Sequence, residues 1–343
     1  MGQVYVDENS LSSIGNAIRN ITNTTNNFYP NQMGPAIENI SMGPEITDAS
    51  YLFFHGARMS EHTDLINCIS PNVHYTVAMF SELYTAIYPS EIPIFNTSSV
   101  TLASNMFFNY VMLRNVPAFN FSNLTQAQYM FGNCSNLTYI PNFITSDKLQ
   151  NLCGTFRYCF NITDTSNISY WNTENVNNVY QMFLFCNHIS TINDLNLPKV
   201  TDLKNFCGAC HSLVSLNNCN FSNVQNLWQS FGQCWNLQAT PDIHSDNIIN
   251  MCEAFNNCIS LTEVIQYNTL KVNDMSKTFQ FCNNLSNDSI QNIINMCLNS
   301  NITNTTRMNL MTTNTYSPFS NTIFDNSYYQ DRWQELTDAG WTY

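Results

Sequence analysis

Apolar residues recur along this chain at a fixed interval. The frame Phe-x-x-Cys-x-x-Leu, seen at Phe131, Cys134 and Leu137, returns many times with related residues in its three places. If the Phe position is taken as the anchor of each copy, the anchors stand at positions 107, 131, 156, 183, 207, 231, 255 and 279, at an almost constant interval. A fixed period of about 20 to 29 residues indicates a chain of structural repeats that stack on one another.

Each repeat contains two different spacings of apolar residues. Counted from the anchor, positions −7, −4, 0 and +3 are apolar in most copies, as in Val224, Leu227, Phe231 and Cys234. Steps of three and four are typical of one helix face and predict a short helix. Positions +6, +9 and +12 are apolar too, and Pro recurs at +10, which favours an extended segment there. We therefore predict an α/β solenoid of the leucine-rich-repeat-like type, with one short helix and one short strand in each repeat of about 24 residues.

The segment before the repeats has a different pattern. Residues 1–42 contain apolar residues at helical spacing, followed by a polar loop and a second short apolar stretch. Short helices with exposed apolar faces need a partner, so we predict that 1–42 is a helical docking segment. The residues that would form its first docking face are Leu11, Ile14, Ile18 and Ile21.

We assign the repeat region to residues 43–298 and a C-terminal cap to 299–343. Within the repeat region, residues 43–106 hold degenerate repeats that match the Phe-x-x-Cys-x-x-Leu frame only loosely, with Phe80 and Phe54 at the anchor position. Irregular terminal repeats are expected because they close the stack.

The end of the repeat region has helical character. Residues 285–298 have the spacing of a longer amphipathic helix, which Asp288 or Ser289 would cap.

Composition narrows the class of partner. Charged residues make up 10% of the chain and the formal net charge is −13, whereas an average protein has about 25% charged residues. Nucleic acids and anionic membranes attract clustered Lys and Arg, so neither is an expected partner. The sequence has no apolar run of about 18 residues and no basic-then-apolar start, so we expect neither a membrane span nor a signal peptide.

The cysteines resemble a chemical motif but follow the repeat. Of 13 cysteines, seven occupy position +3. Successive helical layers would lie about 8–10 Å apart, whereas a disulfide needs Cα atoms within about 7 Å, so we predict free, buried thiols. Cys207-Gly-Ala-Cys210-His211 has the form of a haem or redox motif, yet Cys210 is a +3 residue and Cys207 fills an anchor place. We interpret this motif as structural.

No arrangement of residues indicates catalysis. The six histidines share no spacing with carboxylates, and a zinc site near His55, His62 and His74 is less favoured than a solvated loop. Phosphate-binding loops, nucleophile motifs and paired carboxylates are absent from the sequence. We therefore expect no catalytic residue, metal or cofactor, and a protein that is not an enzyme.

The repeat also has a family resemblance. Met-Phe-x-x-Cys-x-x-Leu-x-x-Ile-Pro at 130–141 resembles the BspA-type leucine-rich repeats of bacterial and phage surface proteins. The opening segment, with Ala-Ile-Arg at 17–19 and Tyr-Pro-Asn-Gln-Met at 29–33, is similar to the start of many phage tail proteins. Asp-Ala-Gly-Trp at 338–341 resembles the end of tail proteins that carry such repeats. The resemblance implies a non-enzymatic virion tail protein, a tail fibre or receptor-binding component assembled in the host cytoplasm.

Two functions follow from these observations. In the first, residues 1–42 dock on other virion tail proteins and the repeats bind a host receptor, a glycan or a protein. The candidate contacts are aromatic residues outside the constant positions, whose rings stack on sugars or anchor interfaces, unless they cover a neighbouring repeat. They are Tyr139, Tyr170, Trp171 and Trp235.

In the second, the protein is a structural tail or decoration protein that packs against other virion subunits. A bacterial surface adhesin is a third alternative, which would require an export signal or a wall anchor. A homo-oligomer is compatible with all three, and no heptad pattern specifies one.

Overall fold

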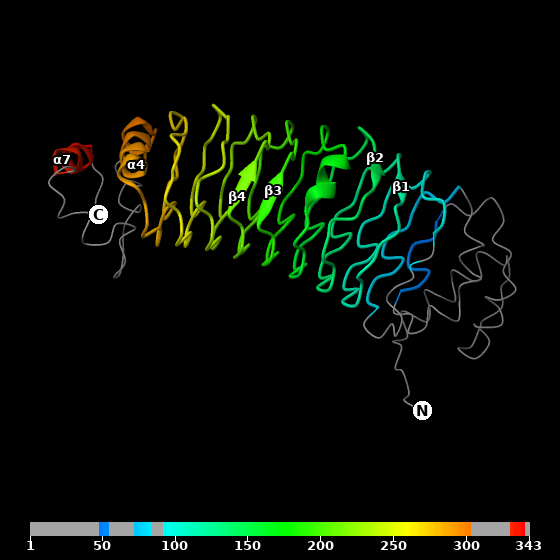
Figure 1. Cartoon of the computed structure of the whole chain (residues 1–343). Helices are drawn as coiled ribbons and strands as arrows, with labels where there is room; N and C mark the ends of the chain where they lie inside the picture. The colour runs from blue at the N-terminus through cyan, green and yellow to red at the C-terminus, as the bar shows by residue number, and fades with distance from the viewer. Residues whose placement is uncertain (1–47, 55–71, 84–91, 93, 303–329, 340–343) are drawn as a thin grey trace, which may run out of the picture.

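The repeats lie side by side in chain order. The computed structural model describes residues 48–54, 72–83, 92, 94–302 and 330–339. Figure 1 shows successive coils of the chain, each beside the next, from the blue segments near the N-terminal end to the orange helix α4. The predicted docking residues Leu11, Ile14, Ile18 and Ile21 lie outside the described residues, as do His55 and His62.

The helix predicted in each repeat is absent from the described repeats, and consecutive tight turns take its place. In the repeat anchored at Phe131, Met130 donates its N–H to Ala127, and Cys134 donates to Phe131, so each bond closes a four-residue turn. Tyr129 and Asn133 have φ of 52° and 61°, which no α-helix accommodates. The same pair of positions, −2 and +2, has positive φ in every repeat from Phe80 to Phe279.

Alternate N–H groups of the turns point along the stack. Ala127, Tyr129, Phe131 and Asn133 donate to the carbonyls of Asn151, Cys153, Thr155 and Arg157 at 2.7–3.0 Å. Four such bonds, each worth about 0.5–1.5 kcal/mol net, offset two left-handed residues that cost about 1–2 kcal/mol each. Turns every three or four residues also bring positions −7, −4, 0 and +3 inward, which is why the apolar spacing imitates a helix.

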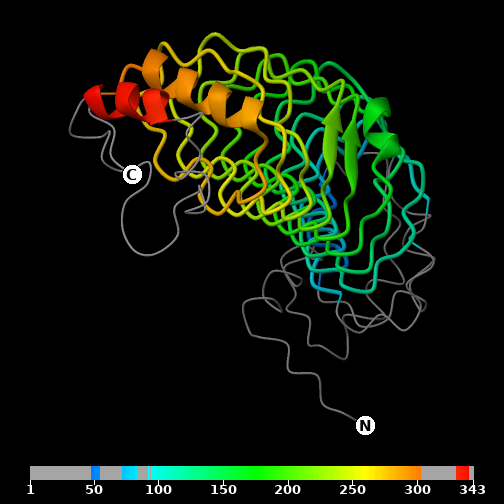
Figure 2. The ribbon, with the colours of Figure 1, turned by 60° about the vertical axis from the view of Figure 1, so that its left-hand side comes forward.

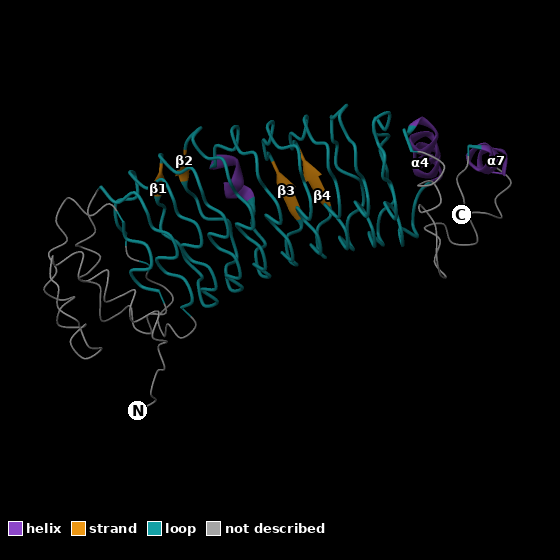
Figure 3. Ribbon diagram, turned by 180° about the vertical axis from the view of Figure 1, so that it is seen from behind, coloured by secondary structure: helices purple, strands orange, loops and turns teal. Residues whose placement is uncertain are grey.

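In the described repeats, the strands are few and parallel. β1 (Asn120–Phe121) pairs with β2 (Ile144–Thr145), and β3 (Thr191–Asn193) pairs with β4 (Ser215–Asn217). Each pairing joins equivalent positions of neighbouring repeats, as in Asn120 with Ile144 and Thr191 with Ser215. Figure 3 shows that loops and turns make up most of each coil. A 3-10 helix, η2 (Ser166–Tyr170), occupies the lengthened repeat between the anchors Phe156 and Phe183.

A ladder of aromatic rings fills the core. The anchor rings from Phe53 to Phe183, and again from Phe231 to Phe279, stack with centroids 5.2–5.6 Å apart and planes within 3–7°. The ladder is interrupted at Cys207, where Phe206 supplies the ring instead. Phe206 meets Phe183 and Phe231 edge-on, with interplanar angles of 81° and 79°. Its ring therefore fills the space that an anchor ring at position 207 would occupy.

In the first described repeat, the anchor lies one residue before the predicted position. Phe53 is buried and stacks on Phe80 at 5.2 Å, whereas Phe54 is only half-buried. The assignment of Phe54 as the anchor was therefore wrong, because the ring that continues the ladder is that of Phe53.

Asparagine and aspartate have a structural position in each repeat. The side-chain oxygen at position −5 accepts the N–H of the residue two places on, as Asn151 does from Cys153 and Asn226 from Trp228, at 3.0 Å. Such Asx turns recur at Asp48, Asn178, Asp202, Asn250 and Asp274. Asn and Asp at this position therefore serve turn formation.

Among the described residues, two helices follow the repeats. α4 (Asn287–Asn299) begins after Ser286, whose hydroxyl accepts the N–H of Ser289, so the cap is Ser286 and not Asp288 or Ser289. α4 buries Ile290, Ile293 and Ile294 against the last repeat. α7 (Gln330–Asp338) lies beside α4 in Figure 2, joined by a hydrogen bond from Arg332 to Asn295. No helix in the described part of the chain is long and apolar enough to cross a membrane.

Candidate binding surface

The four aromatic residues proposed from the sequence occupy different positions of the repeat. Tyr139 stands at +8, Tyr170 at +14, Trp171 at +15 and Trp235 at +4 from their anchors. They therefore do not form one column of side chains. Two of them, Tyr170 and Trp235, are 63% and 44% exposed.

Trp171 is a core residue, which corrects its assignment as a surface contact. Only 3% of it is exposed, and its indole stacks on Phe143 at 5.4 Å. Its Nε1–H donates to the carbonyl of Pro141 at 2.9 Å, which satisfies its polar group inside the core. The ring fills the space that the longer repeat creates.

Tyr139 joins two repeats. It is half-buried against the core, and its hydroxyl accepts the N–H of Val116 at 2.9 Å. This bond ties position +8 to the preceding repeat, so a structural role explains Tyr139.

A different set of side chains covers the turns. Positions −3, −2, +1 and +2 alternate with the buried positions −4, −1, 0 and +3, and position +4 follows them. We call the surface formed by these five positions, −3, −2, +1, +2 and +4, the turn face. The turn face varies from repeat to repeat, whereas the buried positions hold mainly apolar residues. Part of the turn face is aromatic, and we call it the aromatic part. Its residues are half-buried, apart from the more exposed Trp235. These residues are Phe108, Tyr129, Tyr158, Phe160, Tyr180, Phe185, Trp228 and Trp235.

The aromatic rings support one another and two cations. Tyr158 stacks on Phe185 at 5.1 Å and lies 5.9 Å from Phe160. The guanidinium of Arg157 lies over the Tyr158 ring at 4.7 Å. Farther along the stack, Lys204 Nζ lies 4.0 Å from the centre of the Trp228 ring. Such contacts restrict side-chain motion, which lowers the entropy cost of binding.

His211 and Trp235 form a second stack. Their ring centres are 3.7 Å apart and their planes differ by 8°. Burial lowers the pKa of His211, which favours the neutral ring. The pair presents a flat aromatic surface, with Trp235 the more exposed partner.

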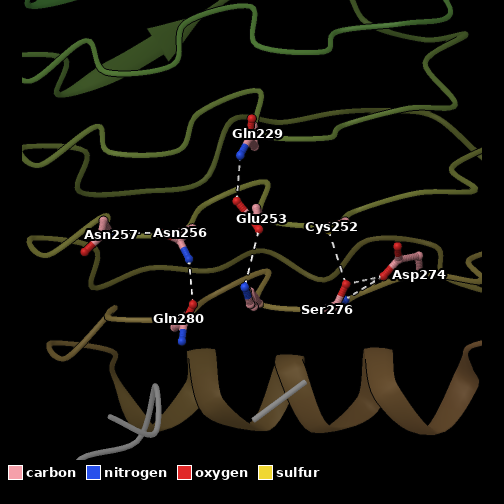
Figure 4. A network of polar contacts seen from close by, with 9 residues as sticks. Gln229, Cys252, Glu253, Asn256, Asn257, Asp274, Ser276 and Gln280 are labelled. Atoms are coloured by element: carbon pink, nitrogen blue, oxygen red, sulfur yellow. Dashed lines mark hydrogen bonds and ion pairs between the residues drawn. The ribbon is translucent and has the colours of Figure 1, made fainter. Parts of the chain in front are cut away.

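The turn face becomes polar toward α4, as Figure 4 shows. Gln229 donates to Glu253 at 2.6 Å, and Glu253 also meets Lys277 at 3.7 Å. The side-chain amide of Asn256 donates to the side-chain oxygen of Gln280 at 2.9 Å, and both residues stand at position +1 of their repeats. These side chains satisfy one another along the stack. We call Gln229, Glu253, Asn256, Asn257, Ser276, Lys277 and Gln280 the polar part of the turn face; Ile259 and Phe281 are apolar residues beside it.

An open hollow of about 440 Å³ lies within the aromatic part. Its lining spans three consecutive repeats. The lining residues are Phe108, Asn109, Gly132, Asn133, Arg157, Tyr158 and Phe160.

Two glycines shape the surface around the hollow. A Cβ at Gly132 would lie 2.9 Å from the Phe108 ring, and one at Gly154 would lie 2.2 Å from the Tyr129 ring. Each aromatic ring therefore packs against a glycine of the next repeat. The sequence contained this signal, because in both cases a glycine stands one repeat after an aromatic residue, at the same position of the repeat. None of Phe108, Tyr129, Arg157, Tyr158 and Phe160 is among the contact residues that the sequence predicts.

The thiols of the cysteines at position +3, which we call the column thiols, are hydrogen-bonded within the core. Each +3 cysteine donates its S–H to the carbonyl of the preceding anchor, as Cys134 does to Phe107 at 3.0 Å and Cys258 to Phe231 at 3.2 Å. The seven cysteines at position +3 are free and buried, as predicted, and the other described cysteines are free as well. The reason offered for it was wrong, since the anchor rings stack at 5.2–5.6 Å and no helical layers separate them.

The Cys207–His211 motif contributes no exposed thiol. Cys207 and Cys210 are fully buried, and Cys210 donates to the Phe183 carbonyl. Burial raises the pKa of Cys207 well above its ordinary value, which disfavours the reactive thiolate. Within the described residues, no three His, Cys, Asp or Glu side chains are grouped as metal ligands would be.

Comparison with known proteins identifies the family. The profile described as "Mycoplasma protein of unknown function, DUF285" matches four overlapping stretches, residues 22–143, 90–215, 140–243 and 225–329. The chain belongs to this family. Overlapping matches are what a chain of similar repeats gives, and they agree with a BspA-like repeat protein. The search of curated proteins gave no match. The search of solved structures also gave none.

Proposed function

We propose that this protein is a non-enzymatic attachment protein that binds a surface receptor through the aromatic part of the turn face. The observation that carries the proposal is the concentration of aromatic side chains at positions that the repeat core does not use. Tyrosine and tryptophan are the residues most often responsible for binding energy at interfaces. Stacking partners such as Phe185 for Tyr158 hold the rings in place before binding.

The fold class belongs to the same proposal. A leucine-rich-repeat-like solenoid of the BspA type is supported by parallel pairings between equivalent positions of neighbouring repeats, such as Thr191 with Ser215, and by the overlapping family matches. A solenoid presents an extended surface made of equivalent positions from many repeats. The turn face is such a surface.

The first setting is a phage tail. The resemblance of both chain ends to phage tail proteins supports a virion component, with residues 1–42 docking on other tail proteins and the turn face meeting the host. The second setting is a cell-surface adhesin. The family description supports it, because it names proteins of Mycoplasma, a cellular organism.

Cell binding tests the proposal and separates the two settings. The full chain, labelled with a fluorophore, is titrated onto Mycoplasma cells and onto animal epithelial cells. A phage attachment protein should bind the bacterial cells saturably, and an adhesin should bind the animal cells. Absence of saturable binding to both, with a folded chain, would overturn the attachment function and favour a structural tail protein.

A matched pair of variants locates the binding surface. Tyr158→Ala with Trp235→Ala should weaken binding about 30-fold or more, since the loss of even one hot-spot ring costs about 2 kcal/mol. Asn256→Ala with Gln280→Ala, in the polar part of the turn face, should leave binding within about twofold, because interface energy is concentrated in few residues.

A further inference from the structure

The hollow between Phe108 and Phe160 combines apolar walls with a single cation. Tyr158 and the two phenylalanines supply ring surfaces, and Asn109 and Asn133 supply amides. The Asn133 amide donates to Asn109 at 2.6 Å, and Asn109 donates to Glu82 at 2.8 Å. The polar side of the hollow is therefore ordered before any ligand binds.

Arg157 is oriented by the wall of the hollow. Its Nη2 donates to the Tyr158 hydroxyl at 3.2 Å, and its guanidinium lies over the ring. Its Nε is buried and has no hydrogen-bond partner among the described residues. No described carboxylate forms a salt bridge with Arg157; the ion pairs of the described residues join His244 with Asp242, Lys277 with Glu253, and Arg332 with Glu335. A buried N–H of a charged group without a partner is costly, and an incoming acceptor relieves that cost.

The size and chemistry of the hollow fit one class of ligand. A volume of about 440 Å³ is at the lower end of the range of about 300–1,000 Å³ for small-molecule sites. Flat rings bind the apolar faces of sugars, amides bind sugar hydroxyls, and a guanidinium binds a carboxylate in two parallel hydrogen bonds. The Glu82 carboxylate lies beyond Asn109 rather than in the lining, so it leaves the Arg157 end positive.

We propose that this hollow binds a saccharide residue that carries a carboxylate, with Arg157 on the carboxylate and Tyr158 and Phe160 against the sugar ring. The inference rests on the proposed attachment function and names the chemical class of its receptor. It makes the aromatic part of the turn face selective for acidic glycans. The other cation of this part, Lys204, lies over Trp228 at a separate place on the turn face.

Two simple glycosides test the inference. Methyl β-D-glucuronide and methyl β-D-glucoside differ only in the carboxylate, and their binding to the full chain is followed by saturation-transfer NMR. The glucuronide should bind about tenfold more tightly, the effect of one charge-assisted pair. Arg157→Gln should remove the difference while the glucoside still binds, whereas Lys204→Gln should preserve it. Equal binding of the two glycosides, or no saturation by either, would overturn the inference.

Two controls separate the possible failures. Acetate that displaces the glucuronide as well as the glucuronide itself does would show recognition of an anion alone, and would overturn the saccharide assignment. Cell binding by a chain that binds neither glycoside would overturn the hollow as the receptor site and leave the attachment function standing. Glucuronide binding without binding to any cell would support the hollow and count against attachment.

Discussion

At the scale of single residues, the cysteines have one function in the fold. A thiol at position +3 is small enough for the interior of a tight turn and supplies a weak donor to the anchor carbonyl of the preceding repeat. The sequence predicted their burial, because the seven cysteines follow the repeat register. It did not predict their bonds, because a helix would have used those carbonyls for its own N–H groups.

Removal of one column thiol should be more costly than removal of a thiol from the turn face. Cys258→Ala loses the bond to Phe231 and leaves a small cavity, so we expect a loss of about 1–2 kcal/mol in the free energy of unfolding. Cys252→Ala, at a half-buried position, should lose less. Urea denaturation of both variants measures the difference, and equal losses would contradict the role of the S–H bond.

Alkaline pH should destabilise the protein through the same thiols. Burial raises the pKa of Cys258 well above 9.0 and that of Cys282 to about 12, so the folded state keeps both protons where the unfolded chain releases them. Their contribution is complete below pH 9 and is lost as pH rises above it, by about 1.4 kcal/mol per pH unit for each thiol.

Urea denaturation between pH 8 and pH 10.5 measures this loss. Tyr110, whose pKa burial raises to about 12, adds to the loss above pH 10. Cys258→Ala removes one thiol and should therefore show a shallower decline than the unmodified chain. Parallel pH profiles for the two proteins would refute the contribution of Cys258.

At the scale of elements, the sequence predicted the repeat length and its register but not its local structure. Helices and successive tight turns both place apolar residues three and four apart. Positive φ usually marks glycine, yet positions −2 and +2 hold Tyr129, Gln181 and Lys277 among others. Nothing local in these residues distinguishes a turn from a helix. The hydrogen bonds between neighbouring repeats stabilise the turns, and they depend on the whole stack.

Gly154 tests the turn geometry directly. Its φ is 59°, and an added Cβ would lie 2.2 Å from the Tyr129 ring. Gly154→Ala should therefore lower the free energy of unfolding by about 1–3 kcal/mol, because the change adds both backbone strain and a clash. In Gly232→Ala the new Cβ meets no atom closer than 3.4 Å, so this variant should lose less. Thermal unfolding of the two variants should rank them in this order, and the reverse order would refute the assigned geometry.

The neighbours Tyr170 and Trp171 should differ strongly in how much stability their substitution costs. Trp171→Ala removes a buried ring and should cost about 3–5 kcal/mol of stability. Tyr170→Ala removes an exposed ring and should change stability by less than about 0.5 kcal/mol. Chemical denaturation distinguishes them, and a stable Trp171→Ala protein would contradict the placement of this indole in the core. The sequence did not separate the two residues, because both follow the anchor in the lengthened repeat.

At the scale of the whole molecule, different positions of the repeat have different roles. Buried positions hold the ring ladder and the thiols, and position −5 holds the Asx turns. The turn face is left to vary, with aromatic residues from Phe108 to Trp235 and a polar network toward α4. The sequence pointed to Trp235 in this surface and missed the others, because their common position is visible only once the turns replace the helix.

The most direct test of the attachment function is the binding of labelled full chain to cells, compared between the two double variants of the turn face. If the aromatic part is the receptor surface, Tyr158→Ala with Trp235→Ala should weaken binding about 30-fold or more. Asn256→Ala with Gln280→Ala should bind as the unmodified chain does, and both variants should retain its thermal unfolding midpoint within about 5 °C. Equal binding by the two folded variants would contradict the assignment of receptor binding to the aromatic part of the turn face.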